Sequence, residues 1–120
     1  MKIERFEDIE VWKLSREIIS RIYRITETGN FCRDFELKRQ IRRASISIMS
    51  NISEGFERRS NKEFVHFLFI AKGSAGEVRS HLYIAYDLEY IDIHDLNDLK
   101  SRLEIISKSL SGFIKYLIAN

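Results

Sequence analysis

The residues of this chain whose types and spacing could do chemistry are basic, and they form two short clusters. The first places four cations within six residues: Lys38, Arg39, Arg42 and Arg43. The second places three within five residues: Arg58, Arg59 and Lys62. Guanidinium groups donate paired hydrogen bonds to phosphate, and the unpaired N–H groups at a helix start also favour anions. The clusters have two interpretations, a solvated helix face or a phosphate-contacting surface, and the presence of a second cluster favours contact with a polyanion.

The distribution of charge points the same way, although the net charge is only +2. Residues 33–79 hold ten Lys or Arg against six Asp or Glu, whereas residues 80–120 hold four against six. Exposed aromatic residues for base stacking cannot be identified, because Tyr83, Tyr86 and Tyr90 are expected in the core or at an interface. Any nucleic-acid binding is therefore expected to be dominated by the phosphate backbone and weakly specific for sequence.

A polar stripe follows the first cluster and interrupts an otherwise apolar helical pattern. Ser47, Asn51 and Glu54 lie beside the apolar series 37, 41, 44, 48 and 52 at helical spacing. An unpaired amide or carboxylate beside a core costs about 1–3 kcal/mol. These side chains are therefore predicted to face another helix or another subunit, leaving the neighbouring arginines outside.

Catalysis finds little support in the chain. His66, His81 and His94 are 15 and 13 residues apart, without the close pairing that lets two helix residues share a metal ion. Glu63 and His66 form a single Glu-x-x-His step, and Glu63 is better explained as part of a capping box with Ser60. We expect no enzyme activity, no metal and no cofactor, and a nuclease using Glu54 and Glu77 is the least favoured function.

The elements that must position these residues are helical. The 120 residues include no proline and five glycines, and apolar side chains recur every three to four residues. This pattern predicts four helices, at about 8–26, 34–54, 60–90 and 92–118, in a single domain spanning residues 1–120. Short connections favour an all-α, antiparallel up-down-up-down four-helix bundle.

Three glycines carry specific predictions. Gly55 is predicted to take the left-handed turn after the second helix. Gly73 and Gly76 fall inside the third helix, where each costs about 1 kcal/mol relative to alanine, so a closely approaching neighbouring helix is the expected compensation.

Location can also be inferred from composition. Cys32 is the single cysteine, no apolar run reaches the length of a membrane span, and the first ten residues are too charged for a signal peptide. We expect a soluble, cytoplasmic protein without a membrane contact.

The chain resembles a known family at several motifs. They are the Val-Trp-Lys near the start, RRASISIMSNISEG at 42–55, Ser60 with Glu63 and the two phenylalanines that follow, and the Gly-Ser-Ala-x-Glu step at 73–77. Together they resemble the bacterial four-helix-bundle family encoded in intervening sequences of 23S ribosomal RNA genes. The chain departs from the family pattern by having Asn30-Phe31-Cys32, and no proline, between the first two helices.

The resemblance implies a helical bundle that assembles into a ring-shaped homo-oligomer, typically a pentamer. It also implies kinship with the accessory barrel protein of diversity-generating retroelements, which works with a reverse transcriptase and contacts nucleic acid through a basic surface. The motif residues carried over by position form a structural polar motif with two flanking arginines: Ser47, Asn51, Glu54, Gly55, Ser74 and Glu77, with Arg42 and Arg43.

Two functions from different classes remain open at this level. The favoured one is a non-enzymatic homo-oligomer that binds structured RNA or a nucleoprotein through its basic surface. The alternative is a protein scaffold that docks a partner such as a polymerase without touching nucleic acid. Glutamate substitutions at Arg42 and Arg43 are expected to separate them, by abolishing RNA binding or by breaking the oligomer.

Overall fold

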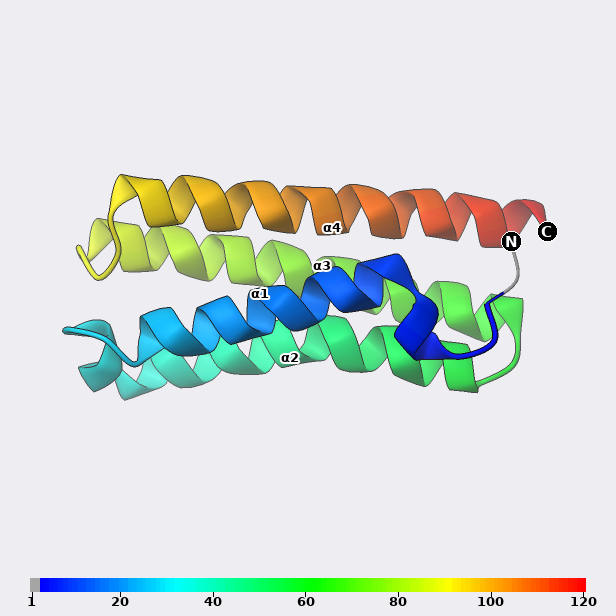
Figure 1. The fold of residues 1–120 in the computed structure, drawn as a ribbon, viewed down its shortest axis with the longest axis horizontal. Coiled ribbons are helices and arrows are strands. Elements are labelled where there is room, and N and C mark those ends of the chain that lie inside the picture. Colours follow the sequence, from blue (N-terminus) through cyan, green and yellow to red (C-terminus); the bar gives the residue numbers. More distant parts are fainter. Residues whose placement is uncertain (1–2) are drawn as a thin grey trace.

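The computed structural model describes residues 3–120, which form an antiparallel bundle of four α-helices (Figure 1). The helices are α1 (Glu10–Thr26), α2 (Phe35–Glu57), α3 (Asn61–Asp87) and α4 (Ile93–Ala119), preceded and interrupted by the short 3-10 turns Phe6–Asp8 and Phe31–Arg33. Successive helices run in opposite directions, and the described residues contain no strand. The prediction of an all-α up-down-up-down bundle is confirmed.

Helices α2, α3 and α4 each begin directly after a residue whose side chain caps the first turn. Asp34 accepts a hydrogen bond from the backbone N–H of Leu37 at 3.1 Å, and Asp92 accepts one from Asp95 at 2.8 Å. Ser60 accepts from the backbone N–H of Glu63 at 3.4 Å, which confirms the predicted start of α3. Each cap satisfies a donor that the first helical turn leaves unpaired.

One hydrophobic core runs along the bundle, which measures 46 × 21 × 19 Å. Each helix contributes the side chains that recur on its inner face, for example Ile22 on α1, Ile41 on α2, Leu82 on α3 and Leu103 on α4, all of them fully buried. The inner face of α4 is formed by one buried series: Leu96, Leu99, Leu103, Ile106, Leu110, Ile114 and Leu117. None of the helices in residues 3–120 has the length and apolar character needed to cross a bilayer.

Gly55 has a different role from the predicted one. It does not end α2, which continues to Glu57, and the left-handed conformation falls on Arg59 instead, with φ of 59°. A Cβ atom at Gly55 would lie 2.7 Å from Cβ of Phe67 and 2.9 Å from Cδ1 of Phe64. The glycine is therefore required because α3 approaches α2 closely beside their connection.

Gly73 and Gly76 show the opposite situation. A Cβ atom added at either position has no heavy atom within 4 Å among the described residues, apart from the helix's own backbone. The expected close approach of a neighbouring helix does not occur within the chain, since both glycines lie on the outer side of α3.

Candidate nucleic-acid interface

Part of the predicted polar stripe forms a hydrogen-bonded seam between α2 and α3. The hydroxyl of Ser47 accepts hydrogen bonds from the Ser74 hydroxyl and from the Asn51 amide, both at 2.9 Å. The same amide donates to the backbone carbonyl of Ser47 at 2.8 Å. Ser74 is buried, whereas Ser47 and Asn51 are half-buried, so the seam lies at the edge of the core. The Ser47–Ser74 bond joins α2 to α3, whereas the Asn51 amide bonds to Ser47 within α2.

Glu54 and Glu77 do not join that seam, so a contact of Glu54 with a neighbouring helix is not found within the described residues, and a contact with another subunit stays a prediction. Both are exposed. Glu54 pairs with Arg58 one turn along α2 at 3.0 Å, and Glu77 lies 3.9 Å from Nε2 of His81 on α3. Both residues face solvent and not the contact between α2 and α3. An exposed carboxylate with an ion-pair partner avoids the free-energy cost of burying its charge.

The first basic cluster is divided by a clamp that holds the end of α1 against α2. Arg42 donates to Oγ1 of Thr26 at 2.9 Å and to Oε1 of Glu27 at 2.6 Å, and its guanidinium lies 4.1 Å from the ring centroid of Tyr23. Lys38 reaches the same Glu27 oxygen at 3.2 Å. The side chains of Arg42 and Lys38 are only 19% and 18% exposed. Both cations are therefore bound by groups of the protein itself, and Arg42 is not free as expected.

The electrostatics of the clamp follow from this arrangement. Hydrogen bonds from Arg42 and then Lys38 lower the pKa of Glu27 below its ordinary value. The carboxylate remains charged at neutral pH and offsets much of the positive charge beside it.

The other half of the first cluster faces outward. Arg39 is 74% exposed and pairs with Glu36 at 2.8 Å, and Arg43 is exposed with no ion pair to the part of the chain that is described. Phe35 lies beside them and is 74% exposed, an unusual position for a phenylalanine. These side chains bound a surface hollow of about 450 Å³, here named the α1–α2 hollow and lined by Tyr23, Phe35, Lys38, Arg39, Arg42, Arg43 and Ile46.

The aromatic residues of this hollow were missed by sequence reasoning. Phe35 follows the Asp34 cap and occupies the first position of α2, outside the register of the inward-facing Leu37 and Ile41. An aromatic residue that does not fit the apolar period next to a basic run was the available signal. Base stacking, which the sequence left without a candidate, has one in Phe35.

The second cluster lies at the other end of α2. Fifteen residues separate Arg43 from Arg58, or about 22 Å along the helix. Arg58 is engaged, because it bridges Glu54 and Glu63 at 3.0 and 3.1 Å. The guanidinium of Arg59 lies 5.7 Å from the ring centroid of Phe56, and Lys62 is exposed without an ion pair in residues 3–120. The fold does not bring the two clusters together.

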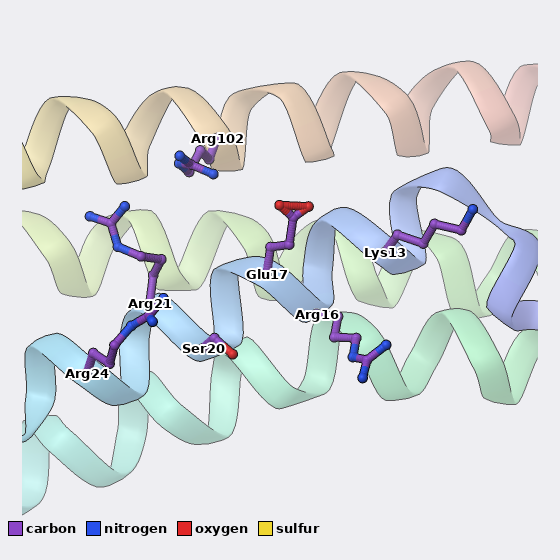
Figure 2. A pocket seen from close by; sticks show the side chains of 7 residues that line it. All are labelled: Lys13, Arg16, Glu17, Ser20, Arg21, Arg24 and Arg102. Atoms are coloured by element: carbon purple, nitrogen blue, oxygen red, sulfur yellow. The ribbon is translucent and has the colours of Figure 1, made fainter.

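A third basic surface lies between α1 and α4, where the sequence shows no cluster. Its hollow, of about 630 Å³, is lined by Lys13, Arg16, Glu17, Ser20, Arg21, Arg24 and Arg102 (Figure 2). Arg21 and Arg102 share Asp98 as partner, at 2.9 and 3.2 Å. Figure 2 shows Glu17 and Arg21 directed toward α4 and Arg16 directed away from it. Most of the charge that points into this hollow is therefore already neutralised.

Metal-ligating side chains are not grouped in the described residues, where no three of His, Cys, Asp and Glu are placed to hold one ion. The Cys32 thiol is half-buried, 3.8 Å from Nζ of Lys38. His81 is buried, and its Nδ1 has no hydrogen-bond partner in the part of the chain described.

The fold and the surface define a class: a small antiparallel four-helix bundle with an α2–α3 polar seam and an exposed aromatic residue among arginines. Residues 7–112 match the model of the family described as 23S rRNA-intervening sequence protein, and the chain belongs to that family. The resemblance to this family is thereby confirmed, whereas the relation to the accessory barrel protein stays a prediction.

A solved structure supports the assignment. It is a protein of unknown function from the S23 ribosomal protein family of Bacteroides thetaiotaomicron, which is 29% identical to this chain with a TM-score of 0.81. The similarity covers 88% of this chain and 95% of that one. No curated protein matches the chain.

Proposed function

We propose that this protein is a non-enzymatic RNA-binding bundle that acts in the cytoplasm and takes unpaired RNA bases in its α1–α2 hollow. The single observation that carries the proposal is the exposure of Phe35 beside Arg39 and Arg43. A phenylalanine that is 74% exposed contributes little to the packing of the core, and its ring offers a flat face on which any base can stack.

The charges around Phe35 suit a single strand better than a duplex. Arg43 has no ion pair among the described residues, and the pair between Arg39 and Glu36 is exposed, so that exchanging the carboxylate for a phosphate costs little. Stacking of a base on Phe35 contributes about 1–3 kcal/mol, but a base inside a duplex cannot reach the ring. The hollow is therefore selective for single-stranded segments, loops and ends.

Fluorescence anisotropy with a labelled single-stranded RNA tests the proposal. Phe35→Ala is expected to weaken binding roughly 5- to 100-fold, which corresponds to the loss of one stacked base. Ile118→Ala is the control, because Ile118 is also exposed, at 68%, but lies in the last turn of α4 and outside the lining of the hollow. Equal affinities of the two variants would refute the assignment of the hollow.

Charge variants complete the test. Replacing Arg39 and Arg43 by glutamine is expected to lower the salt dependence of binding, by about 0.7 in log–log slope for each phosphate that is no longer neutralised. Arg42 is unsuitable for this purpose, because its removal would also break the clamp on Glu27. Binding that does not depend on salt would contradict the proposal.

Self-assembly is the second part of the proposed function. We infer a ring-shaped homo-oligomer, a pentamer by resemblance, and the supporting observation is a pair of exposed apolar side chains on α3, Phe69 and Ile70. A ring would repeat the α1–α2 hollow by symmetry, and linked weak contacts can add a hundredfold or more in apparent affinity. Light scattering of Ile70→Lys, compared with the unchanged protein, tests the inference, since a mass that stays the same in both would exclude this face.

The same exposed side chains favour the alternative function, a scaffold that docks a polymerase such as a reverse transcriptase, as the relation to the accessory barrel protein would imply. A protein that assembles but binds no single-stranded RNA at low salt would support the scaffold and exclude RNA binding.

A further inference from the structure

A groove between α3 and α4 gathers four cations that the sequence keeps apart. It has a volume of about 570 Å³ and is lined by Lys72, Arg79, Glu104, Ser107, Lys108, Ser111, Gly112 and Lys115. Two of the cations come from α3 and two from α4, the helix that belongs to the acidic part of the sequence. We name it the α3–α4 groove.

The charge of this groove is not compensated. None of the four cations has an ion pair with any residue in the described range 3–120, and Glu104 is the only carboxylate among the described residues of the lining. This differs from the α1–α2 hollow, where Glu27 neutralises Lys38 and Arg42, and from the α1–α4 hollow, where Asp98 binds two arginines. Four like charges held together without partners favour binding of an anion.

The spacing of the cations matches an extended chain of phosphates better than a single ion. Lys72 and Arg79 are seven residues apart on α3, and Lys108 and Lys115 are seven apart on α4, so each pair spans about 10 Å along its helix. The helices are antiparallel neighbours, so the two pairs form rows on either side of one seam. A row of this length can contact successive phosphates of one strand.

The α4 side of the groove also allows a ligand to approach the helix backbone closely. A Cβ atom at Gly112 would have no heavy atom within 4 Å other than the backbone of its own helix. Ser107 and Ser111 lie on the same side of α4 and carry hydroxyl donors. The lining includes no aromatic residue, so it offers nothing on which a base could stack.

We propose that the α3–α4 groove binds the sugar-phosphate backbone of RNA, as a second contact site that does not distinguish duplex from single strand. The proposal rests on the proposed function in taking RNA as the polyanion. The seam between α3 and α4 lies across the bundle from the seam between α1 and α2, because the helices follow one another around the core (Figure 1). One protomer therefore holds an unpaired segment on one face and a backbone, duplex included, on the other.

The test uses the double variant Lys108→Gln/Lys115→Gln and a blunt 20-base-pair RNA duplex in an anisotropy titration over a series of salt concentrations. Both lysines line the groove and are unpaired among the described residues, so their loss should leave the thermal melting temperature unchanged. We expect a loss of duplex affinity of tenfold or more and a decrease of up to about 1.8 in log–log salt slope. The matched control is Arg5→Gln/Arg33→Gln, which removes the same formal charge from two residues outside the groove.

The outcomes separate this proposal from the proposed function. Duplex affinity and slope equal to those of the control would overturn the α3–α4 groove, even if Phe35→Ala still weakened binding of single-stranded RNA. If the lysine variant binds the duplex more weakly and Phe35→Ala leaves the affinity for single-stranded RNA unchanged, the α1–α2 hollow is excluded as an RNA site and the α3–α4 groove is supported. Absence of any duplex binding at low salt would also overturn the groove.

Discussion

Replacing Gly55 by alanine should destabilise the bundle, whereas the same substitution at Gly76 should stabilise it. Both glycines lie inside helices, so each substitution gains about 1 kcal/mol of helix propensity. The positions differ in what surrounds the new methyl group. At Gly76 it meets no heavy atom within 4 Å in the described chain beyond its own helix, while at Gly55 it meets two phenylalanines.

The steric term at Gly55 can be assessed from the neighbours. The contact of 2.7 Å is to Cβ of Phe67, which cannot move without its backbone, and Cα of Phe64 is at 3.4 Å. The Cδ1 atom of Phe64, at 2.9 Å, can rotate away. The two helices must therefore separate slightly, and overpacking of this kind costs about 1–3 kcal/mol. Since the propensity gain is common to both variants, the difference between their unfolding free energies isolates this steric term.

Urea denaturation followed by circular dichroism measures that difference. We expect Gly76→Ala to be more stable than Gly55→Ala by about 1–3 kcal/mol, with thermal midpoints several degrees apart. Comparable stability of the two variants would refute the packing argument at Gly55. A loss of stability in Gly76→Ala would show that the outer side of α3 is packed against another copy of the chain.

Three further predictions concern the contacts between helices. Ser47→Ala should lower the unfolding free energy, measured in urea, by about 1–3 kcal/mol, because two hydrogen-bond donors lose their acceptor. Ser50→Ala, on the exposed side of α2, is the control and should have little effect. Equal effects of the two substitutions would exclude a special role of the seam. The pKa of Glu27 is lowered in the folded protein, so its contribution is present above the ordinary value of 4.5 and is lost as the pH falls; the melting temperature of Glu27→Gln should lie below that of the unchanged protein at pH 7, and the two should converge in acid. The hydrogen bond to Asp34 raises the pKa of Tyr90 above 10.0, so its contribution to stability is present below pH 10.0 and is lost as the pH rises further. The melting temperature of Tyr90→Phe should therefore be lower than that of the unchanged protein at pH 7 and should fall less between pH 7 and alkaline pH. Melting temperatures that fall in parallel in both proteins would contradict this.

The sequence by itself determined the bundle. Apolar residues at helical spacing, capping residues such as Asp34, Ser60 and Asp92, and the absence of proline are local signals, and they place each helix within a few residues of its observed bounds. The Ser47–Asn51–Ser74 seam was also predictable, because polar groups beside a core must be paired, and the nearest partners lie on the adjoining helix.

The tertiary structure alone decided which charges are available to a ligand. A cation is neutralised by whatever carboxylate the fold brings near it, and that partner can be remote in sequence: Glu27 engages Arg42 from fifteen residues away. The α3–α4 groove cannot be recognised in the sequence for the same reason. Lys72 and Lys108 come together only when α3 and α4 pack side by side. The role of Gly55 likewise depends on where α3 lies, because open space and close contact are properties of the neighbours and not of the residue.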